Sequence, residues 1–234
     1  MAPDVAKRLI WGAIAIAGIV VVSVWPPFRF VSLQAVRQAE EESAFNPKEF
    51  ARVLWNEKLP SVASTAPSIA DVIDALNREA KGAAAKYGTV WGLGGSTYFM
   101  LRGVGRVVTV DENGLEVTID GVATDTRVTL VTDNVFGNTV RNATGLIDPS
   151  EFPNSQDLNN VSIALNGIVM NEVLPALRES ATVGAELRFI GCTAVRNVNS
   201  ISELEIVPIS VDIVRNEEKQ AGILTVFPHG RLVR

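Results

Sequence analysis

The sequence predicts an α+β protein with an N-terminal transmembrane helix, a helical segment and a five-stranded β-barrel of the oligonucleotide/oligosaccharide-binding (OB) type, with a helix between strands 3 and 4. Three observations support this prediction. Residues 9–25 are uncharged and apolar, residues 47–82 place apolar side chains at helical spacing, and beyond the glycine-rich stretch 92–96 the apolar period changes to alternation. An α+β sandwich without a closed barrel is the alternative.

The apolar run extends from Leu9 to Trp25, after Lys7 and Arg8 and before two prolines. Its length of about 17 residues suits a helix crossing a hydrocarbon core of about 30 Å. A cleavable signal begins in the same way, but residues 22–25 are too bulky for signal peptidase, so we expect an uncleaved anchor. The basic residues and the short leading arm favour a cytoplasmic N-terminus. We therefore expect a single-pass protein of the cytoplasmic membrane whose C-terminal domain is extracytoplasmic (periplasmic).

Composition shifts divide the chain into four parts. We expect a membrane anchor at 1–30, a helical stalk and packing helices at 31–95, the OB-like barrel domain at 96–215 and a C-terminal tail at 216–234. One packing helix begins at Asn46-Pro47 and should stop at Leu59-Pro60. A second should begin at Ser68, capped by the serine hydroxyl, and continue to Gly82.

Five segments of the barrel domain alternate in the manner of strands, at 98–110, 115–119, 127–132, 185–195 and 204–214. Gly103 and Gly105 predict a bend or bulge in the first strand, and Pro208 predicts an edge or bulge in the last. A long polar crossing, 133–160, precedes a helix that Pro175 should kink or end. Residues 223–227 suit a further short strand.

Composition argues against several classes of function. The chain has 21 basic and 26 acidic residues and a pI near 5.1, which does not favour nucleic-acid binding. Its one cysteine, Cys192, cannot form an internal disulfide and reads as a buried apolar residue. Its one histidine, His229, lies near the C-terminus. We therefore expect no catalytic residues, no metal, no cofactor and no enzymatic activity.

Amide, hydroxyl and guanidinium side chains gather in the crossing and the following helix, and such groups hold hydroxyl-rich ligands or peptide backbones. The alternative is that these side chains satisfy the backbone groups of the long connection itself. The candidate ligand- or partner-binding residues are Thr139, Arg141, Asn142, Asn154, Gln156, Asn160 and Asn166.

Short motifs in a shared order resemble the bacterial family of predicted periplasmic lipoproteins called domain of unknown function 2291. The motifs are Phe45 to Pro47, Trp55 before Pro60, Gly103-Val104-Gly105, Gly137 to Asn142, Phe152 to Gln156, Ala164 to Asn166 and Val207 to Val211. Two features depart from that family. A spanning helix stands where members commonly carry a lipidated cysteine, and Asn142 stands where they tend to carry an aspartate.

The resemblance implies neighbours among the components of sugar-uptake ABC transporters and no established enzymatic activity. We therefore expect a membrane-anchored accessory or binding protein, with an ABC transporter or its solute-binding protein as partner. A small-ligand or glycan-binding OB-like domain is the alternative function, and a hydrolase using His229 is a weaker one.

Overall fold

The computed structural model describes residues 45–91, 95–112, 114–123, 126–152 and 154–214, together with the backbone of 225–226 and 232–233. By its contacts the chain divides into two units, Met1–Phe45 and Asn46–Arg234. Everything described below, apart from Phe45, belongs to the second unit. The expected anchor at 9–25, the stalk at 31–43 and His229 lie outside the described residues.

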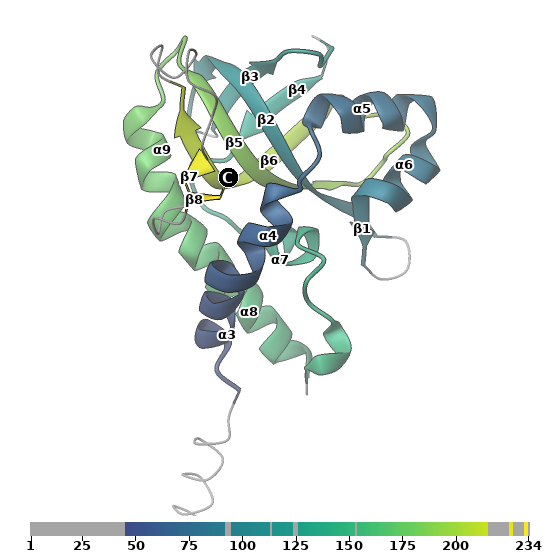
Figure 1. The fold of residues 1–234 in the computed structure, drawn as a ribbon, viewed down its shortest axis with the longest axis vertical. Helices are drawn as coiled ribbons and strands as arrows, with labels where there is room; N and C mark the ends of the chain where they lie inside the picture. Colours follow the sequence, from purple (N-terminus) through teal and green to yellow (C-terminus); the bar gives the residue numbers. More distant parts are fainter. Residues whose placement is uncertain are drawn as a thin grey trace, which may run out of the picture. The chain divides into compact units, whose positions relative to one another are not determined.

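Helices and strands follow one another in blocks along the second unit (Figure 1). The strands are β1 (Gly88–Val90), β2 (Thr97–Val110), β3 (Leu115–Ile119), β4 (Arg127–Leu130), β5 (Glu186–Val195), β6 (Glu203–Ile213), β7 (Thr225–Val226) and β8 (Leu232–Val233). The helical elements are α3 (Pro47–Val53), η1 (Leu54–Lys58), α4 (Leu59–Ser64), α5 (Ile69–Arg78), α6 (Ala80–Tyr87), α7 (Thr139–Ala143), η2 (Pro149–Glu151), α8 (Ser155–Ile168), η3 (Val169–Val173) and α9 (Leu174–Ser180).

Strand β2 organises the main sheet because it pairs with three strands. It runs antiparallel to β1, β3 and β5, whereas β4 runs parallel to β6. The order β1-β2-β3-β4-β6-β5, with the additional β2–β5 pairing, makes a circuit of pairings that returns to β2. The predicted α+β class is confirmed as a six-stranded sheet with helices. Strand β1 was not expected before the glycine-rich stretch, since three residues are too few to show alternation.

Strand β2 changes partner along its length. Residues 97–106 pair with β5 and residues 105–110 pair with β3, with a register shift between Val107 and Thr109. A Cβ at Gly103 would lie 2.7 Å from Cζ of Phe189 and 2.9 Å from Cδ1 of Ile69. The missing side chain therefore leaves room for a core aromatic ring. The predicted long strand is confirmed, but its bulge lies beyond Gly103 and Gly105, which pair with β5 in regular register.

The last strand also contains the irregularity that its proline predicts. Pro208 of β6 pairs with Gly191 of β5, and the register shifts between Ile190 and Gly191. A Cβ at Gly191 would lie 2.3 Å from Cγ2 of Ile206. A proline cannot donate to a ladder, so the bulge accommodates it just after β6 leaves its pairing with β4 (residues 203–206) and begins its pairing with β5 (residues 207–213).

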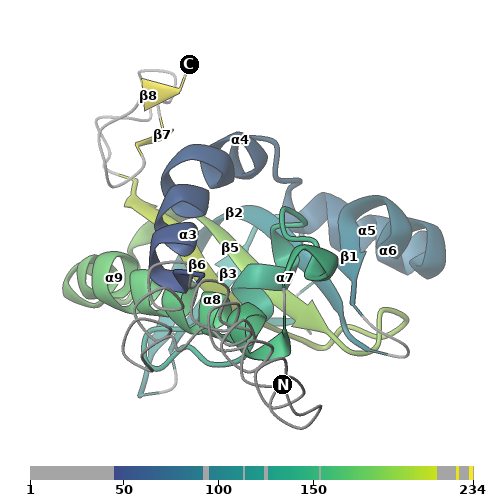
Figure 2. The same cartoon turned by 90° about the horizontal axis from the view of Figure 1, so that it is seen from below.

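The connection from β4 to β5 carries α7, η2 and the long helix α8–η3–α9. The apolar face of the long helix is buried and includes Val161, Leu165 and Val169. Residues 155–179 have the length and apolar composition of a membrane-spanning helix. Half of the apolar 18-residue stretch within them is nevertheless buried inside the fold. This is the burial of a core helix. Figure 2 shows α8 and α9 beside the strands, with α3 and α7 close to α8.

Two Leu-Pro pairs lie within helices that the sequence predicts to stop or kink. Helix α3 does not stop at Leu59-Pro60 but continues through the π-turn η1 into α4, and α8 continues through the π-turn η3 into α9. In each case the leucine N–H bonds to the carbonyl five residues earlier, Leu59 to Leu54 and Leu174 to Val169. The wider turn relieves the clash of the proline ring with the preceding turn, so the helix survives.

The second packing helix is divided. Helix α5 ends at Arg78, and the backbone of Glu79 is not helical. The Glu79 carboxylate accepts the Gly82 N–H at 2.6 Å and so caps the start of α6. Ser68 makes no side-chain cap, contrary to the prediction, but bridges to Arg102 of β2. Pairing with β2 therefore fixes the start of α5.

Candidate functional site

Arg141 lies inside the fold, on α7, and not at its surface. Its Nε donates to Oδ1 of Asn142 at 2.9 Å, and a terminal nitrogen donates to the Leu158 carbonyl at 3.1 Å. The guanidinium also stands 4.8 Å from the ring centre of Trp91. Burial lowers the pKa of Arg141, partly offset by the nearby Tyr98, yet an arginine remains charged in proteins. Arg141 thus ties α7 to α8.

Asn142 and Asn166 are also buried near the same connection. Asn142 accepts the Arg141 bond and donates its backbone N–H to the Asn138 carbonyl at 2.8 Å. Nδ2 of Asn166 donates to the Gly137 carbonyl at 2.9 Å and holds the segment before α7 against α8. The structure therefore brings Arg141, Asn142 and Asn166 to one connection, where they hydrogen-bond to other groups of the same fold.

The other candidates lie apart from this group. Asn154 caps α8 by accepting the Asp157 N–H at 2.8 Å. Gln156 donates to Asn160 at 3.1 Å across one turn of the exposed helix surface, and Thr139 begins α7. No hollow found among the described residues is lined by more than one of these seven side chains. Of the described hollows, Asn160 borders one beside α3, and Asn166 borders another beside the segment 135–138.

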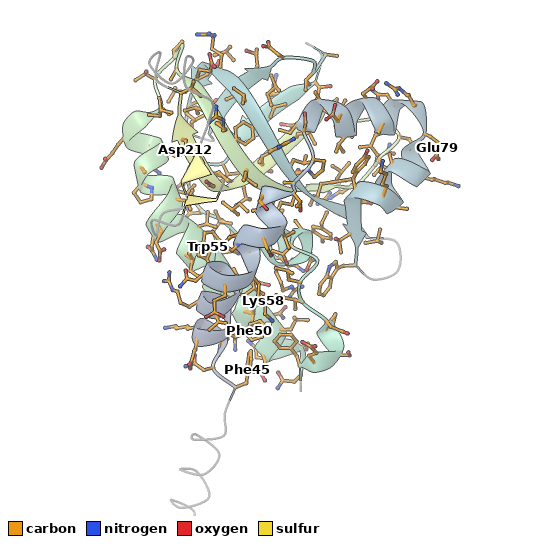
Figure 3. All side chains as sticks on the ribbon, viewed as in Figure 1. Phe45, Phe50, Trp55, Lys58, Glu79 and Asp212 are labelled. Carbon is orange, nitrogen blue, oxygen red and sulfur yellow. The ribbon has the colours of Figure 1, made fainter. Side chains whose placement is uncertain are left out.

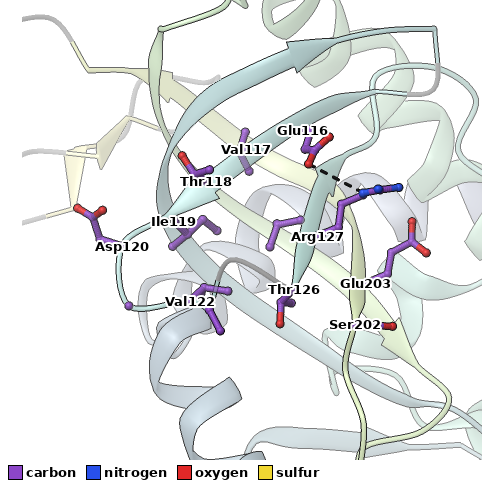
Figure 4. Close-up of a pocket in the computed structure, with 13 residues that line it drawn as sticks. Glu116, Val117, Thr118, Ile119, Asp120, Val122, Thr126, Arg127, Ser202 and Glu203 are labelled. Atoms are coloured by element: carbon purple, nitrogen blue, oxygen red, sulfur yellow. Dashed lines mark ion pairs between the residues drawn. The ribbon is translucent and has the colours of Figure 1, made fainter.

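A larger hollow lies over β3 and β4, where the sequence reading placed no candidate (Figure 4). It has a volume of about 600 Å³ and is lined by β3, the connection to β4, the start of β4 and the first residues of β6. Glu116, Asp120 and Glu203 supply carboxylates, and Thr118, Thr126 and Ser202 supply hydroxyls. We call these residues, together with Arg127, the β3–β4 site.

Charge in the β3–β4 site is predominantly negative. Among the described residues that line the site, Arg127 carries the positive charge. It lies 3.9 Å from the Glu116 carboxylate, and this exposed ion pair contributes little to stability. Carboxylates and hydroxyls accept hydrogen bonds from hydroxyl, ammonium and guanidinium groups. The signal was present in the sequence, because Glu116, Thr118 and Asp120 occupy the polar face of an alternating strand.

The described residues supply little for covalent catalysis or metal binding. Cys192 is fully buried in β5, and desolvation raises its pKa to about 12, which opposes thiolate formation. Within the described ranges, no group of three His, Cys, Asp or Glu side chains could hold a metal ion. The prediction that the chain is not an enzyme stays a prediction.

Comparison with solved structures finds a close match in fold. A crystal structure of an OB-fold protein from Thermotoga maritima superposes with a TM-score of 0.62 and is 28% identical, covering 73% of this chain and 99% of that one. A search of curated proteins finds no significant match.

Comparison with family models confirms the resemblance stated above. The model called DUF2291, predicted periplasmic lipoprotein, matches residues 16–212, which include the crossing and the main sheet as far as Asp212 of β6. The chain belongs to this family of predicted periplasmic lipoproteins.

Proposed function

We propose that this protein is a membrane-anchored, extracytoplasmic binding protein without enzymatic activity, and that the β3–β4 site is its binding surface. The observation that carries the proposal is the hollow of about 600 Å³ over β3 and β4. In OB-folds the face of the second and third strands binds oligonucleotides and oligosaccharides. Counting from β2, these strands are β3 and β4.

Topology supports treating this domain as an OB-like barrel. The circuit β2-β3-β4-β6-β5-β2, the parallel β4–β6 pair and the helix between β4 and β5 agree with that architecture. The OB-fold neighbour from Thermotoga maritima supports the same inference. The excess of carboxylates over basic groups opposes a phosphate backbone and favours a hydroxyl-rich or basic partner.

Location and orientation form the first part of the test. In the full-length chain, Glu112→Cys at the β2–β3 hairpin should react with a membrane-impermeant maleimide added to intact spheroplasts, because we propose that this domain is outside. Cys192 is buried and should give no background. Asp4→Cys is the matched control and should react only after the membrane is permeabilised. Labelling of position 4 but not of position 112 in intact spheroplasts would show the opposite orientation.

Partner identity forms the second part. We propose that the β3–β4 site contacts a component of a sugar-type ABC transporter or its solute-binding protein. A photoreactive amino acid at Thr118 in membranes should yield an adduct with such a component, and the same group at Val183, outside the site, should not. Repeated recovery of no transporter component from position 118 would contradict this assignment.

Glycan binding is the second candidate function, favoured by the hydroxyls and carboxylates that line the hollow. Calorimetry of the full-length protein in detergent against a panel of neutral mono- and disaccharides should then show binding. Glu203→Gln should weaken it about tenfold or more, the loss of one charge-assisted hydrogen bond. Glu205→Gln, on the same strand but outside the lining, should leave it unchanged. No heat with any sugar would remove this candidate.

A further inference from the structure

Strand β1 has an unpaired edge beside a hollow. Among the described strands it pairs with β2 alone, so its other edge carries no ladder. The hollow has a volume of about 430 Å³ and is lined by residues 89–91, 145–149 and 151. We call these residues the β1 groove. It shares no residue with the β3–β4 site, so the function proposed above does not use it.

The two backbone segments of the β1 groove lie close together without pairing. A Cβ on Gly145 would lie 3.4 Å from Oγ1 of Thr89, yet within the described residues no backbone hydrogen bond joins 89–91 to 145–149. An unpaired strand edge presents N–H and C=O groups at the spacing of a further strand. An extended peptide satisfies such an edge, because its own backbone repeats the same groups at the same spacing.

An aromatic side chain in the lining is held in place from inside the fold. Trp91 follows β1 directly, and its ring centre lies 4.8 Å from the guanidinium carbon of Arg141. Arg141 is 3% exposed and is itself held by the Leu158 carbonyl. The indole is therefore restrained before any partner arrives, and restrained tryptophans are favourable anchors in protein interfaces. Val90, which is 60% exposed, adds apolar surface beside it.

The charged residues of the β1 groove, Asp148 and Glu151, are both acidic. Ser150 donates its N–H and its hydroxyl to Oδ1 of Asp148, at 2.8 and 2.7 Å, and so orients that carboxylate. Within the described part of the chain, neither carboxylate forms an ion pair. Charge complementarity therefore favours a peptide that carries lysine or arginine.

We propose that the β1 groove binds an extended segment of a partner protein that carries a basic side chain. The segment adds a strand to β1, its apolar side chains contact Val90 and Trp91, and its lysine or arginine pairs with Asp148 and Glu151. A sugar stacked on the indole would leave the strand edge unpaired. A second copy of this chain would bring two acidic grooves together, and the net charge of −5 adds to that repulsion.

An array of short valine- and threonine-rich peptides, probed with the full-length protein in detergent, tests the chemistry of the partner. Peptides with a central lysine or arginine should be retained, and those with a central glutamate should not. The double variant Asp148→Asn/Glu151→Gln should weaken retention about tenfold or more. It should stay folded by circular dichroism, because an amide oxygen at 148 can still accept the Ser150 bonds. Glu179→Gln, exposed and outside the groove, is the matched control.

Backbone methylation of the retained peptides tests strand pairing itself. Alternate N–H groups of a strand point to opposite edges, so methylating one alternate set should abolish retention and methylating the other set should not. Loss or retention of both sets alike would overturn the proposal, as would equal retention of lysine and glutamate peptides or no retained peptide. A covalent dimer of Val90→Cys with a bifunctional maleimide would assign the edge to a second copy and would also overturn it. None of these results bears on binding at the β3–β4 site.

Discussion

Buried polar side chains in this protein hold its long connection in place. Arg141 joins α7 to the Leu158 carbonyl, and Asn166 holds the Gly137 carbonyl. The Gly137 carbonyl lies outside the helices and gains a partner, whereas the Leu158 carbonyl lies within α8 and gains a second donor. At the residue scale, these contacts agree with the interpretation that the polar side chains of the crossing bond to backbone groups of the fold itself.

Gly103 provides a residue-scale prediction about packing. Gly103→Ala should lower the free energy of unfolding by about 1–3 kcal/mol, because the added methyl would meet Phe189 and Ile69. Gly167→Ala is the control, since its Cβ meets nothing within 4 Å and alanine favours a helix. Denaturant titration of both variants measures the difference. Equal stability of the two would show that the β2 backbone yields at no cost.

Cys192 provides a prediction about pH. Its pKa is raised to about 12 by burial, so the unfolded chain releases the thiol proton near pH 9 while the folded chain retains it. Stability from this group is therefore complete below pH 9 and falls as pH rises from 9 to 12. Between pH 8 and 10.5 the natural chain should lose about 2 kcal/mol more than Cys192→Ala. Parallel losses in denaturant titrations would contradict the buried thiol.

At the scale of elements, side-chain caps determine where some helices begin, and the local sequence predicts some of these caps but not all. Asn154 caps α8, as is typical of an asparagine directly before a helix. In the same way, the Asn46 side chain accepts the N–H groups of Lys48 and Glu49 at the start of α3. Phe50 of α3 meets Phe152 edge-to-face, with ring centres 5.5 Å apart, and so joins the first helix to the segment before α8. Figure 3 marks Phe50 and Trp55 on this first helix.

Asn154 also separates a structural from a binding role. Asn154→Ala should reduce the free energy of unfolding by about 1 kcal/mol, because the Asp157 N–H loses its acceptor. Gln156→Ala, two residues further along on the exposed surface, should change it by less than about 0.5 kcal/mol. Thermal unfolding of the two variants checks this. A larger loss at Gln156 would place that side chain in a contact outside the described residues.

At the scale of the whole molecule, β2 is the strand that pairs with three others, β1, β3 and β5. It pairs with β5 over residues 97–106 and with β3 over residues 105–110, and it is the strand on which the circuit closes. Disruption of β2 would therefore open both ladders at once. Strand β1, by contrast, is a three-residue edge.

Hydrogen exchange should follow this arrangement. Backbone amides of β2 and β5 that pair with each other should exchange most slowly, with protection approaching global unfolding, and those of β1 should exchange at least about a hundredfold faster. Mass spectrometry of the full-length protein in detergent can measure this after proteolysis. Equal protection of β1 and β2 would show that the edge strand belongs to the same cooperative unit.

The sequence by itself determined the α+β class, the family, the order of the strands from β2 to β6 along the chain and the irregularity at Pro208, because alternation and proline geometry are local properties. The register shift of β2 lies between Val107 and Thr109, beyond the glycines that predicted it. Only the tertiary structure decided how the Leu-Pro helices continue, since a π-turn depends on packing along the whole helix. It also decided where the polar side chains go. Arg141 and Asn166 are candidate binding groups in a linear sequence, but in the fold they donate to the backbone carbonyls of Leu158 and Gly137, which only folding brings within reach. The β3–β4 site, in turn, is completed by Ser202 and Glu203, which are distant in sequence from β3 and β4 and reach them through the β4–β6 pairing.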